Sequence, residues 1–215
     1  HDLLTELYQE NRSEGEFSLS PEAMGKRALQ NYALRILDDP KLVKSHYDNA
    51  KTMTERVGAL SVLADNGDIP EKLEAFEDYF ERFKKYPLVI DKWFVLQACA
   101  VEPGVINNIK TLRQHADFKI KNPNRVRSLY AAFAFNNPVY FHAADGKGYE
   151  FLTDFILEYD TLNPQVAARI LGPMKSWKRY TKDRQIKMKD CLEKIANQSG
   201  LSENVYEVVS KSLKA

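Results

Sequence analysis

Two helical patterns in the sequence carry arginine side chains that are suited to binding a carboxylate. In the helix expected after Asn163, Gln165 and Arg169 are four residues apart and therefore share one flank. In an earlier expected helix, Arg125 and Arg127 lie on opposite sides of the apolar stripe. Arginine holds a carboxylate through two parallel hydrogen bonds. These residues are candidates for anion binding, and the alternative is that they are ordinary surface residues.

Motifs for a catalytic or metal centre are missing from the sequence. It contains no H-E-x-x-H or C-x-x-C pattern, no nucleophile elbow and no phosphate-binding glycine loop. No two histidines are spaced to bind a metal on one helical turn; they are His1, His46, His115 and His142. We therefore expect no catalytic residue, metal site or cofactor within this chain.

The two cysteines predict core positions and a reducing compartment. Cys99 and Cys191 each fall within an expected helix, where a thiol is usually a small buried hydrophobe. Two cysteines in 215 residues do not form a disulfide framework. We therefore expect the protein to be located in the cytoplasm.

Composition and charge are those of an ordinary globular protein. Apolar residues make up 44% and charged residues 28% of the chain, which argues against disorder. The net charge of +1 gives no global attraction to nucleic acid or to an anionic membrane, and the apolar runs are too short to span a bilayer. The chain starts at His1 without a signal-peptide pattern or an initiator methionine, so we expect a fragment or a processed product.

One segment departs from this charge balance. Residues 175–189 contain seven basic residues and one acidic residue, with Trp177 and Tyr180 interleaved. Nucleic-acid sites combine charge and aromatic rings in this way. A solvated helix whose long side chains cover apolar surface has the same pattern. We favour the solvated helix because the whole chain is near neutral.

The elements that position these residues are predicted to be short helices. Eight of the nine prolines stand where a helix can begin, and in three cases asparagine precedes the proline as a helix cap. Gly172-Pro173 is interpreted as a helix stop. We expect ten to twelve helices in an all-α, superhelical array of paired antiparallel helices, similar to HEAT or armadillo repeats, within a single domain over residues 1–215.

Several motifs, taken together in their order along the chain, resemble the C-terminal domain of bacterial aminopeptidase N, a zinc-dependent enzyme of the gluzincin family. Weaker similarity precedes them in residues 49–60. The motifs are Asn124-Arg125-Val126-Arg127-Ser128-Leu129, Asn137-Pro138, Phe141-His142-Ala143-Ala144-Asp145-Gly146-Lys147-Gly148-Tyr149, Asn163-Pro164-Gln165-Val166-Ala167-Ala168-Arg169 and Lys178-Arg179-Tyr180.

The resemblance implies a fragment of a longer multidomain enzyme that removes N-terminal residues from peptides. The zinc ligands would lie in the catalytic domain of the same polypeptide, and this segment, inactive alone, would close the active-site cavity. Arg127 and Arg169 would engage the carboxylate side of the peptide, and Gln165 would lie near its first side chain. Arg125 has no such role. The alternative is a free-standing helical scaffold that binds protein partners through an apolar patch.

Overall fold

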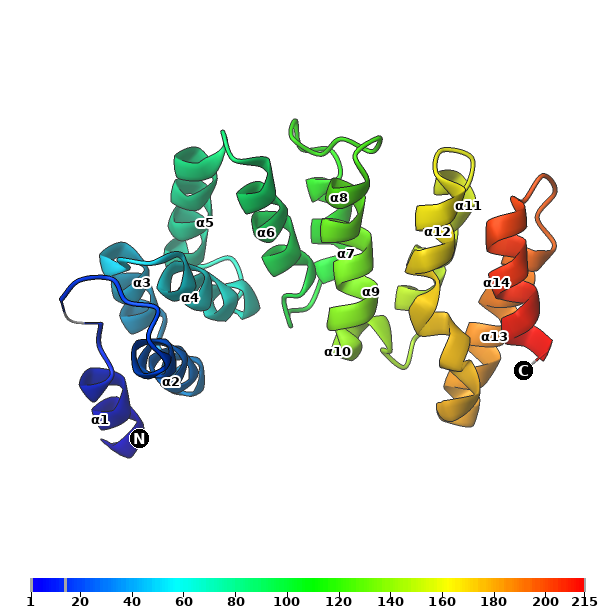
Figure 1. Cartoon of the computed structure of the whole chain (residues 1–215). Coiled ribbons are helices and arrows are strands. Elements are labelled where there is room, and N and C mark those ends of the chain that lie inside the picture. Colours follow the sequence, from blue (N-terminus) through cyan, green and yellow to red (C-terminus); the bar gives the residue numbers. More distant parts are fainter. Residues whose placement is uncertain (1, 14, 215) are drawn as a thin grey trace. The chain divides into compact units, whose positions relative to one another are not determined.

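The computed structural model describes residues 2–13 and 15–214, and every regular element in them is helical. Fourteen α-helical segments are present, together with one π-helical turn and one 3-10 helix (Figure 1). The expected all-α fold is therefore confirmed, with more helical segments than the ten to twelve anticipated. Within the described ranges, no helix is both long and apolar enough to cross a bilayer. Two compact units, residues 1–96 and 97–215, are described in turn.

The first unit is built from helical hairpins. Helix α1 packs on α2, α2 packs on α4, and α3 packs on both α4 and α5. Its core contains the fully buried side chains of Leu34, Tyr47, Leu63 and Tyr79. The helices of this unit are α1 (Asp2–Glu10), α2 (Pro21–Leu37), α3 (Pro40–Asn49), α4 (Met53–Asp65), α5 (Pro70–Phe83) and α6 (Pro87–Ala98), the last of which continues into the second unit.

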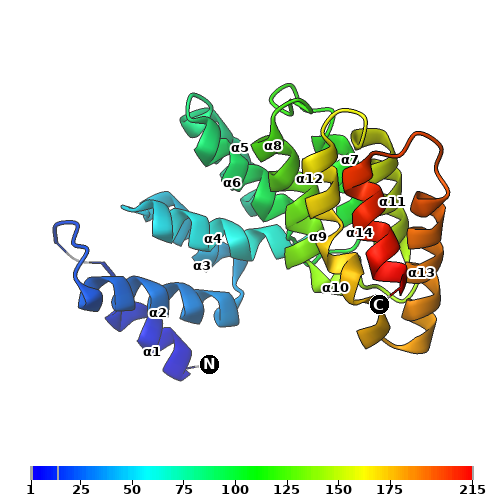
Figure 2. The ribbon, with the colours of Figure 1, turned by 45° about the vertical axis from the view of Figure 1, so that its right-hand side comes forward.

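The second unit has two rows of helices, which Figure 2 shows with α8, α9, α12 and α14 in front of α7, α11 and α13. Helix α12 contacts the π turn η1 and α14, and α11 contacts α13. Segments α8, η1 and α9 follow one another without a break. The elements are α7 (Val105–Leu112), α8 (Pro123–Val126), η1 (Arg127–Ala131), α9 (Ala132–Asn136), α10 (Pro138–Phe141), α11 (Lys147–Tyr159), α12 (Pro164–Ile170), the 3-10 helix η2 (Gly172–Arg179), α13 (Lys182–Ala196) and α14 (Glu203–Lys214).

Stacked aromatic rings fill the space between the rows. The ring of Tyr130 in η1 lies flat on Phe155 of α11, with centroids 3.4 Å apart. Tyr159 continues the stack at 5.1 Å from Phe155. All three side chains are nearly inaccessible to solvent. The stack fixes the register between η1 and α11, because large rings tolerate little sliding in a close-packed interior.

Most helix starts follow the proline signals. Seven of the prolines occupy the first position of an α-helix, as expected from their preset φ and missing N–H. Asn122, Asn137 and Asn163 each cap a helix by accepting a hydrogen bond from a backbone N–H, at 3.0, 3.2 and 3.1 Å. After Pro103 the helix begins two residues later, at Val105.

The interpretation of Gly172-Pro173 as a plain stop is wrong in part. Helix α12 does end at Ile170, but the 3-10 helix η2 begins at Gly172 and contains Pro173 in its first turn. Proline supports a new helical start because it lacks only an N–H that would have no partner there. A Cβ at position 172 would lie 2.5 Å from Cζ of Phe135, so the exposed Phe135 ring would have to move if Gly172 were replaced.

Candidate functional site

Arg127 is the first residue of the π turn η1, directly after α8. Asn122 caps α8, and the four-residue helix leads into the turn. The Arg127 side chain is half-buried, and its Nη1 donates to Oδ1 of Asn124 at 3.1 Å. A π turn accommodates one more residue than an α-turn and occurs frequently at functional sites.

Gln165 and Arg169 lie on the exposed flank of α12. Asn163 caps the helix, and the residues between them, Val166, Ala167 and Ala168, are buried. Within the described part of the chain, neither Gln165 nor Arg169 has a hydrogen-bond partner or an ion pair. Their side chains are therefore available to a ligand, in agreement with the shared flank deduced from the spacing of four.

The packing of the second unit brings these residues onto neighbouring elements. The π turn that begins with Arg127 contacts α12, which carries Gln165 and Arg169. Tyr159, at the end of α11, lies close to Arg127: burial raises the pKa of this tyrosine, and the guanidinium of Arg127 opposes that rise. Arg127 and Arg169 therefore lie on contacting elements, and a guanidinium group is suited to binding a carboxylate. Arg125, by contrast, is only 5% exposed, as suits a structural role.

The motif residues around His142 hold loops together. His142 Nδ1 lies 2.9 Å from the hydroxyl of Tyr149, and its Nε2 lies 3.0 Å from the hydroxyl of Tyr180. Arg184 Nε donates to the carbonyl of His142 at 2.7 Å, and Lys187 donates to the carbonyl of Ala144. These contacts tie the loop between α10 and α11 to η2 and α13. Some basic residues of segment 175–189 thus form hydrogen bonds within the fold.

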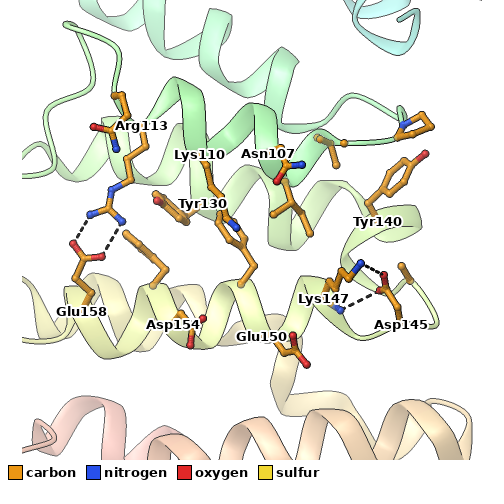
Figure 3. Close-up of a pocket in the computed structure, with 18 residues that line it drawn as sticks. Asn107, Lys110, Arg113, Tyr130, Tyr140, Asp145, Lys147, Glu150, Asp154 and Glu158 are labelled. Carbon is orange, nitrogen blue, oxygen red and sulfur yellow. Dashed lines mark hydrogen bonds and ion pairs between the residues drawn. The ribbon is translucent and has the colours of Figure 1, made fainter.

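A cavity of about 1000 Å³ lies between α7 and α11, and none of Arg127, Gln165 and Arg169 lines it. Figure 3 shows Arg113, which directly follows α7, facing Glu158 of α11, whereas Asp154 and Glu150 of α11 are directed away from α7. The residues that form these walls and the aromatic floor include Lys110, Arg113, Tyr130, Glu150, Phe151, Asp154, Phe155 and Glu158.

Ion pairs neutralise much of this cavity. Arg113 Nη1 donates to Oε2 of Glu158 at 2.8 Å, and the Arg113 guanidinium lowers the pKa of the Glu158 carboxyl. Asp154 is paired with Lys194 of α13 at 2.8 Å. Sequence reasoning did not find the cavity, because Arg113 and Glu158 are 45 residues apart and no local pattern joins them.

The residues that the structure describes do not provide a zinc site. In the described ranges, no group of three or more histidine, cysteine or acidic side chains is arranged to hold a metal ion. Zinc sites in proteins require three or four such ligands.

Comparison with known proteins assigns the family. A family model described as a domain of unknown function (DUF3458_C) with ARM repeats matches residues 1–214. The chain is 38% identical to aminopeptidase N of Caulobacter vibrioides and 37% identical to that of Escherichia coli, in each case over 99% of this chain and 25% of the relative. A crystal structure of Legionella pneumophila aminopeptidase A in complex with aspartic acid superposes with a TM-score of 0.84 at 30% identity, over 99% of this chain and 26% of that one.

The chain therefore spans about a quarter of the length of these relatives. The resemblance to bacterial aminopeptidase N that the motifs indicate is confirmed, and the chain belongs to the DUF3458_C family of ARM-repeat domains.

Proposed function

We propose that this chain is the C-terminal part of a zinc-dependent aminopeptidase and forms a wall of the cavity that holds the peptide substrate. The similarity to aminopeptidases along 99% of the chain supports the enzyme class. The exposed Gln165 and Arg169 on α12, beside the π turn that begins with Arg127, carry the proposal. The positive charges of Arg127 and Arg169 are of the kind that a peptide carboxylate binds.

In this proposal the three residues bind and orient the substrate. Arg127 and Arg169 hold the carboxylate side of the peptide through charge-assisted hydrogen bonds, and Gln165 contacts the first side chain. Correct placement of a substrate lowers the activation barrier without any bond chemistry by the positioning groups. The partner of this wall is the catalytic domain of the same polypeptide.

Zinc and the residues that activate water belong, in this proposal, to the part of the polypeptide outside these 215 residues. The isolated chain should then hydrolyse no peptide, and peptidase assays of the purified chain against the intact polypeptide test this. Cys99 and Cys191 are not joined in a disulfide, which fits the proposed cytoplasmic location.

The decisive experiment compares two substrates in the intact polypeptide. Arg127→Ala and Arg169→Ala should each lower kcat/KM for a tripeptide about 10- to 100-fold, the range expected for one lost charged hydrogen-bonding group. Turnover of a small amino-acid amide without a distal carboxylate should change less than about twofold. Arg179→Ala removes an exposed arginine of η2 and serves as the matched control. Equal losses with both substrates would exclude carboxylate binding.

A helical scaffold without peptidase activity is the second candidate, because an apolar patch is exposed on α2. If the intact polypeptide neither binds zinc nor removes N-terminal residues, the scaffold is the better explanation. The peptidase proposal is favoured because both named aminopeptidase N relatives match the chain almost from end to end.

A further inference from the structure

Exposed apolar side chains are concentrated in the first helices of the chain. Among the described residues, sixteen large apolar side chains are exposed, and seven of these lie between residues 3 and 36. These seven are Leu3, Phe17, Leu19, Met24, Leu29, Tyr32 and Ile36. Single exposed apolar residues are normal, but a contiguous group marks an interaction surface.

Helix α2 presents its more apolar face to solvent. At 100° per residue, the exposed apolar residues fall on one side of the helix and form a continuous stripe. Arg35 also lies on this side, and its guanidinium is directed to Asp65 of α4 at 3.9 Å. The α2 stripe consists of Met24, Gly25, Ala28, Leu29, Tyr32 and Ile36.

The opposite, inward face of α2 carries polar side chains that are fixed by hydrogen bonds. Arg27 donates to the carbonyl of Ser18 at 2.9 Å, Gln30 donates to that of Tyr8 at 3.4 Å, and Asn31 donates to that of Thr54 at 3.1 Å. Rotating α2 to bury its stripe would break these bonds and leave the buried polar groups unpaired. The stripe is therefore exposed because of how α2 is anchored.

The stripe is shaped to receive another helix. A Cβ added to Gly25 would meet no atom within 4 Å, and Ala28 is likewise exposed, so the stripe carries two small residues among larger ones. Small residues among larger ones allow the side-chain ridges of another helix to approach closely. From Met24 to Ile36 the stripe is about 18 Å long, which matches about three helical turns.

The last helix of the chain has the opposite character. The exposed residues of α14 are mostly charged or polar, and Tyr206 is its one large apolar residue that is exposed among those described. Terminal repeats of helical arrays need a polar outer face, whereas inner repeats bury an apolar face on each neighbour. By this criterion the exposed face of α2 has the apolar character of an inner repeat, and the exposed face of α14 does not.

We propose that a helix from outside these 215 residues, in the same polypeptide, stacks on the α2 stripe as a further repeat of the array. The relatives are about four times longer than this chain, so polypeptide is available to supply it. The helix should be amphipathic, with at least three turns of apolar residues facing Ala28 and Tyr32. This inference rests on the longer polypeptide of the proposed function but not on Arg127, Gln165 or Arg169, so the substrate comparison above and the labelling test below can fail separately.

Thiol labelling of the intact polypeptide tests the proposal. Tyr32→Cys and Tyr206→Cys replace tyrosines that are similarly exposed in the chain, at 64% and 55%. We expect maleimide to react with position 32 at least tenfold more slowly than with position 206, as measured by mass spectrometry of the peptides that contain these positions. Equal rates would overturn the proposal. If Tyr32→Cys does not fold, Ala28→Cys probes the same stripe with a smaller change.

The source of any protection is identified by crosslinking. With photoreactive benzoylphenylalanine at position 32, the crosslinked product should be monomeric and should join this position to a segment of the same polypeptide. Light scattering at several concentrations shows whether a dimer forms. A crosslink to a second copy, protection that is lost on dilution, or a crosslink to another protein would each overturn the proposal.

Discussion

His142 and Tyr180 stack with their ring centroids 4.3 Å apart, and the Tyr180 hydroxyl lies 3.0 Å from Nε2 of the histidine. The two residues are 38 positions apart, so this contact joins the loop after α10 to the end of η2. Both belong to motifs that indicated the family. Their contact gives these conspicuous residue types a structural role in the fold.

Removing the Tyr180 hydroxyl should loosen this loop. Tyr180→Phe keeps the stacked ring but leaves Nε2 of His142 without its partner, which we expect to cost about 1 kcal/mol of local stability. Hydrogen exchange of the peptide 140–149 in the intact polypeptide measures this cost as faster exchange. Tyr206→Phe, on the exposed surface of α14, should leave the same peptide unchanged. Similar exchange in both variants would show that the hydrogen bond contributes nothing.

Acid should loosen the same loop. Burial, with the nearby positive charge of Arg184, lowers the pKa of His142, and Tyr149 and Tyr180 face its two ring nitrogens. The unfolded state therefore binds a proton more readily than the folded state. The stabilising contribution is complete above the ordinary histidine pKa of about 6.5 and decreases as the pH falls below it.

Hydrogen exchange of this loop at pH 7.5 and 5.5, corrected for intrinsic rates, should show the loss at the lower pH. His142→Gln offers a side chain that does not titrate, and in this variant the loop should respond much less to pH. An undiminished response would assign the effect to another group. A local measurement is needed because burial also lowers the pKa of His46 in the first unit.

Gly148 occupies a position that excludes a side chain. A Cβ there would lie 2.7 Å from Cα of Phe141 and even closer to the Phe141 carbonyl oxygen. Because these are backbone atoms that cannot rotate away, Gly148→Ala should destabilise the second unit by about 2 kcal/mol or more. Gly67→Ala meets no atom within 4 Å and should be nearly neutral. Urea unfolding of both variants tests the difference, and equal midpoints would contradict it.

The ion pair between Arg113 and Glu158 should contribute little to stability. Both side chains are partly exposed, at 28% and 47%, so solvent screens their attraction. A double-mutant cycle with Arg113→Ala and Glu158→Ala should give a coupling energy of about 0.5 kcal/mol, decreasing with added salt. A coupling above about 2 kcal/mol, insensitive to salt, would mean that the pair is effectively buried.

The sequence predicted the helices better than their faces. Proline and asparagine signals located most helix starts because these residues act through their own backbone geometry and their nearest N–H groups. In α2, Ala28 and Tyr32 are exposed, although apolar residues at helical spacing usually face a core. Which face of a helix is covered depends on neighbours that are distant in sequence or outside the chain.

The candidate site was only partly predictable. The spacing of Gln165 and Arg169 placed them on one flank of α12, since that relation is internal to a helix. The π turn at Arg127 has no local sequence signal, and its contact with α12 arises from tertiary packing. The same applies to the cavity between α7 and α11, whose walls are joined by pairs of residues far apart in the chain.

The cap of α12 should control both the stability of this helix and its proposed role in substrate binding. Asn163 Oδ1 accepts a hydrogen bond from the N–H of Val166 in the first turn of α12. Gln165 and Arg169, two and six residues after Asn163, are exposed on the same helix. Asn163→Ala removes the acceptor and should cost about 1 kcal/mol. Asn163→Asp keeps an acceptor and serves as the matched variant.

If α12 presents Gln165 and Arg169 to the peptide, fraying of its first turn should raise KM for a tripeptide in the intact polypeptide. Asn163→Ala should therefore show a higher KM with little change in kcat, and Asn163→Asp should restore KM toward the original value. A small amide that does not reach Arg169 should be affected only through Gln165, so its KM should rise less than that of the tripeptide. A loss of stability without any change in KM would mean that the first turn of α12 does not position the substrate.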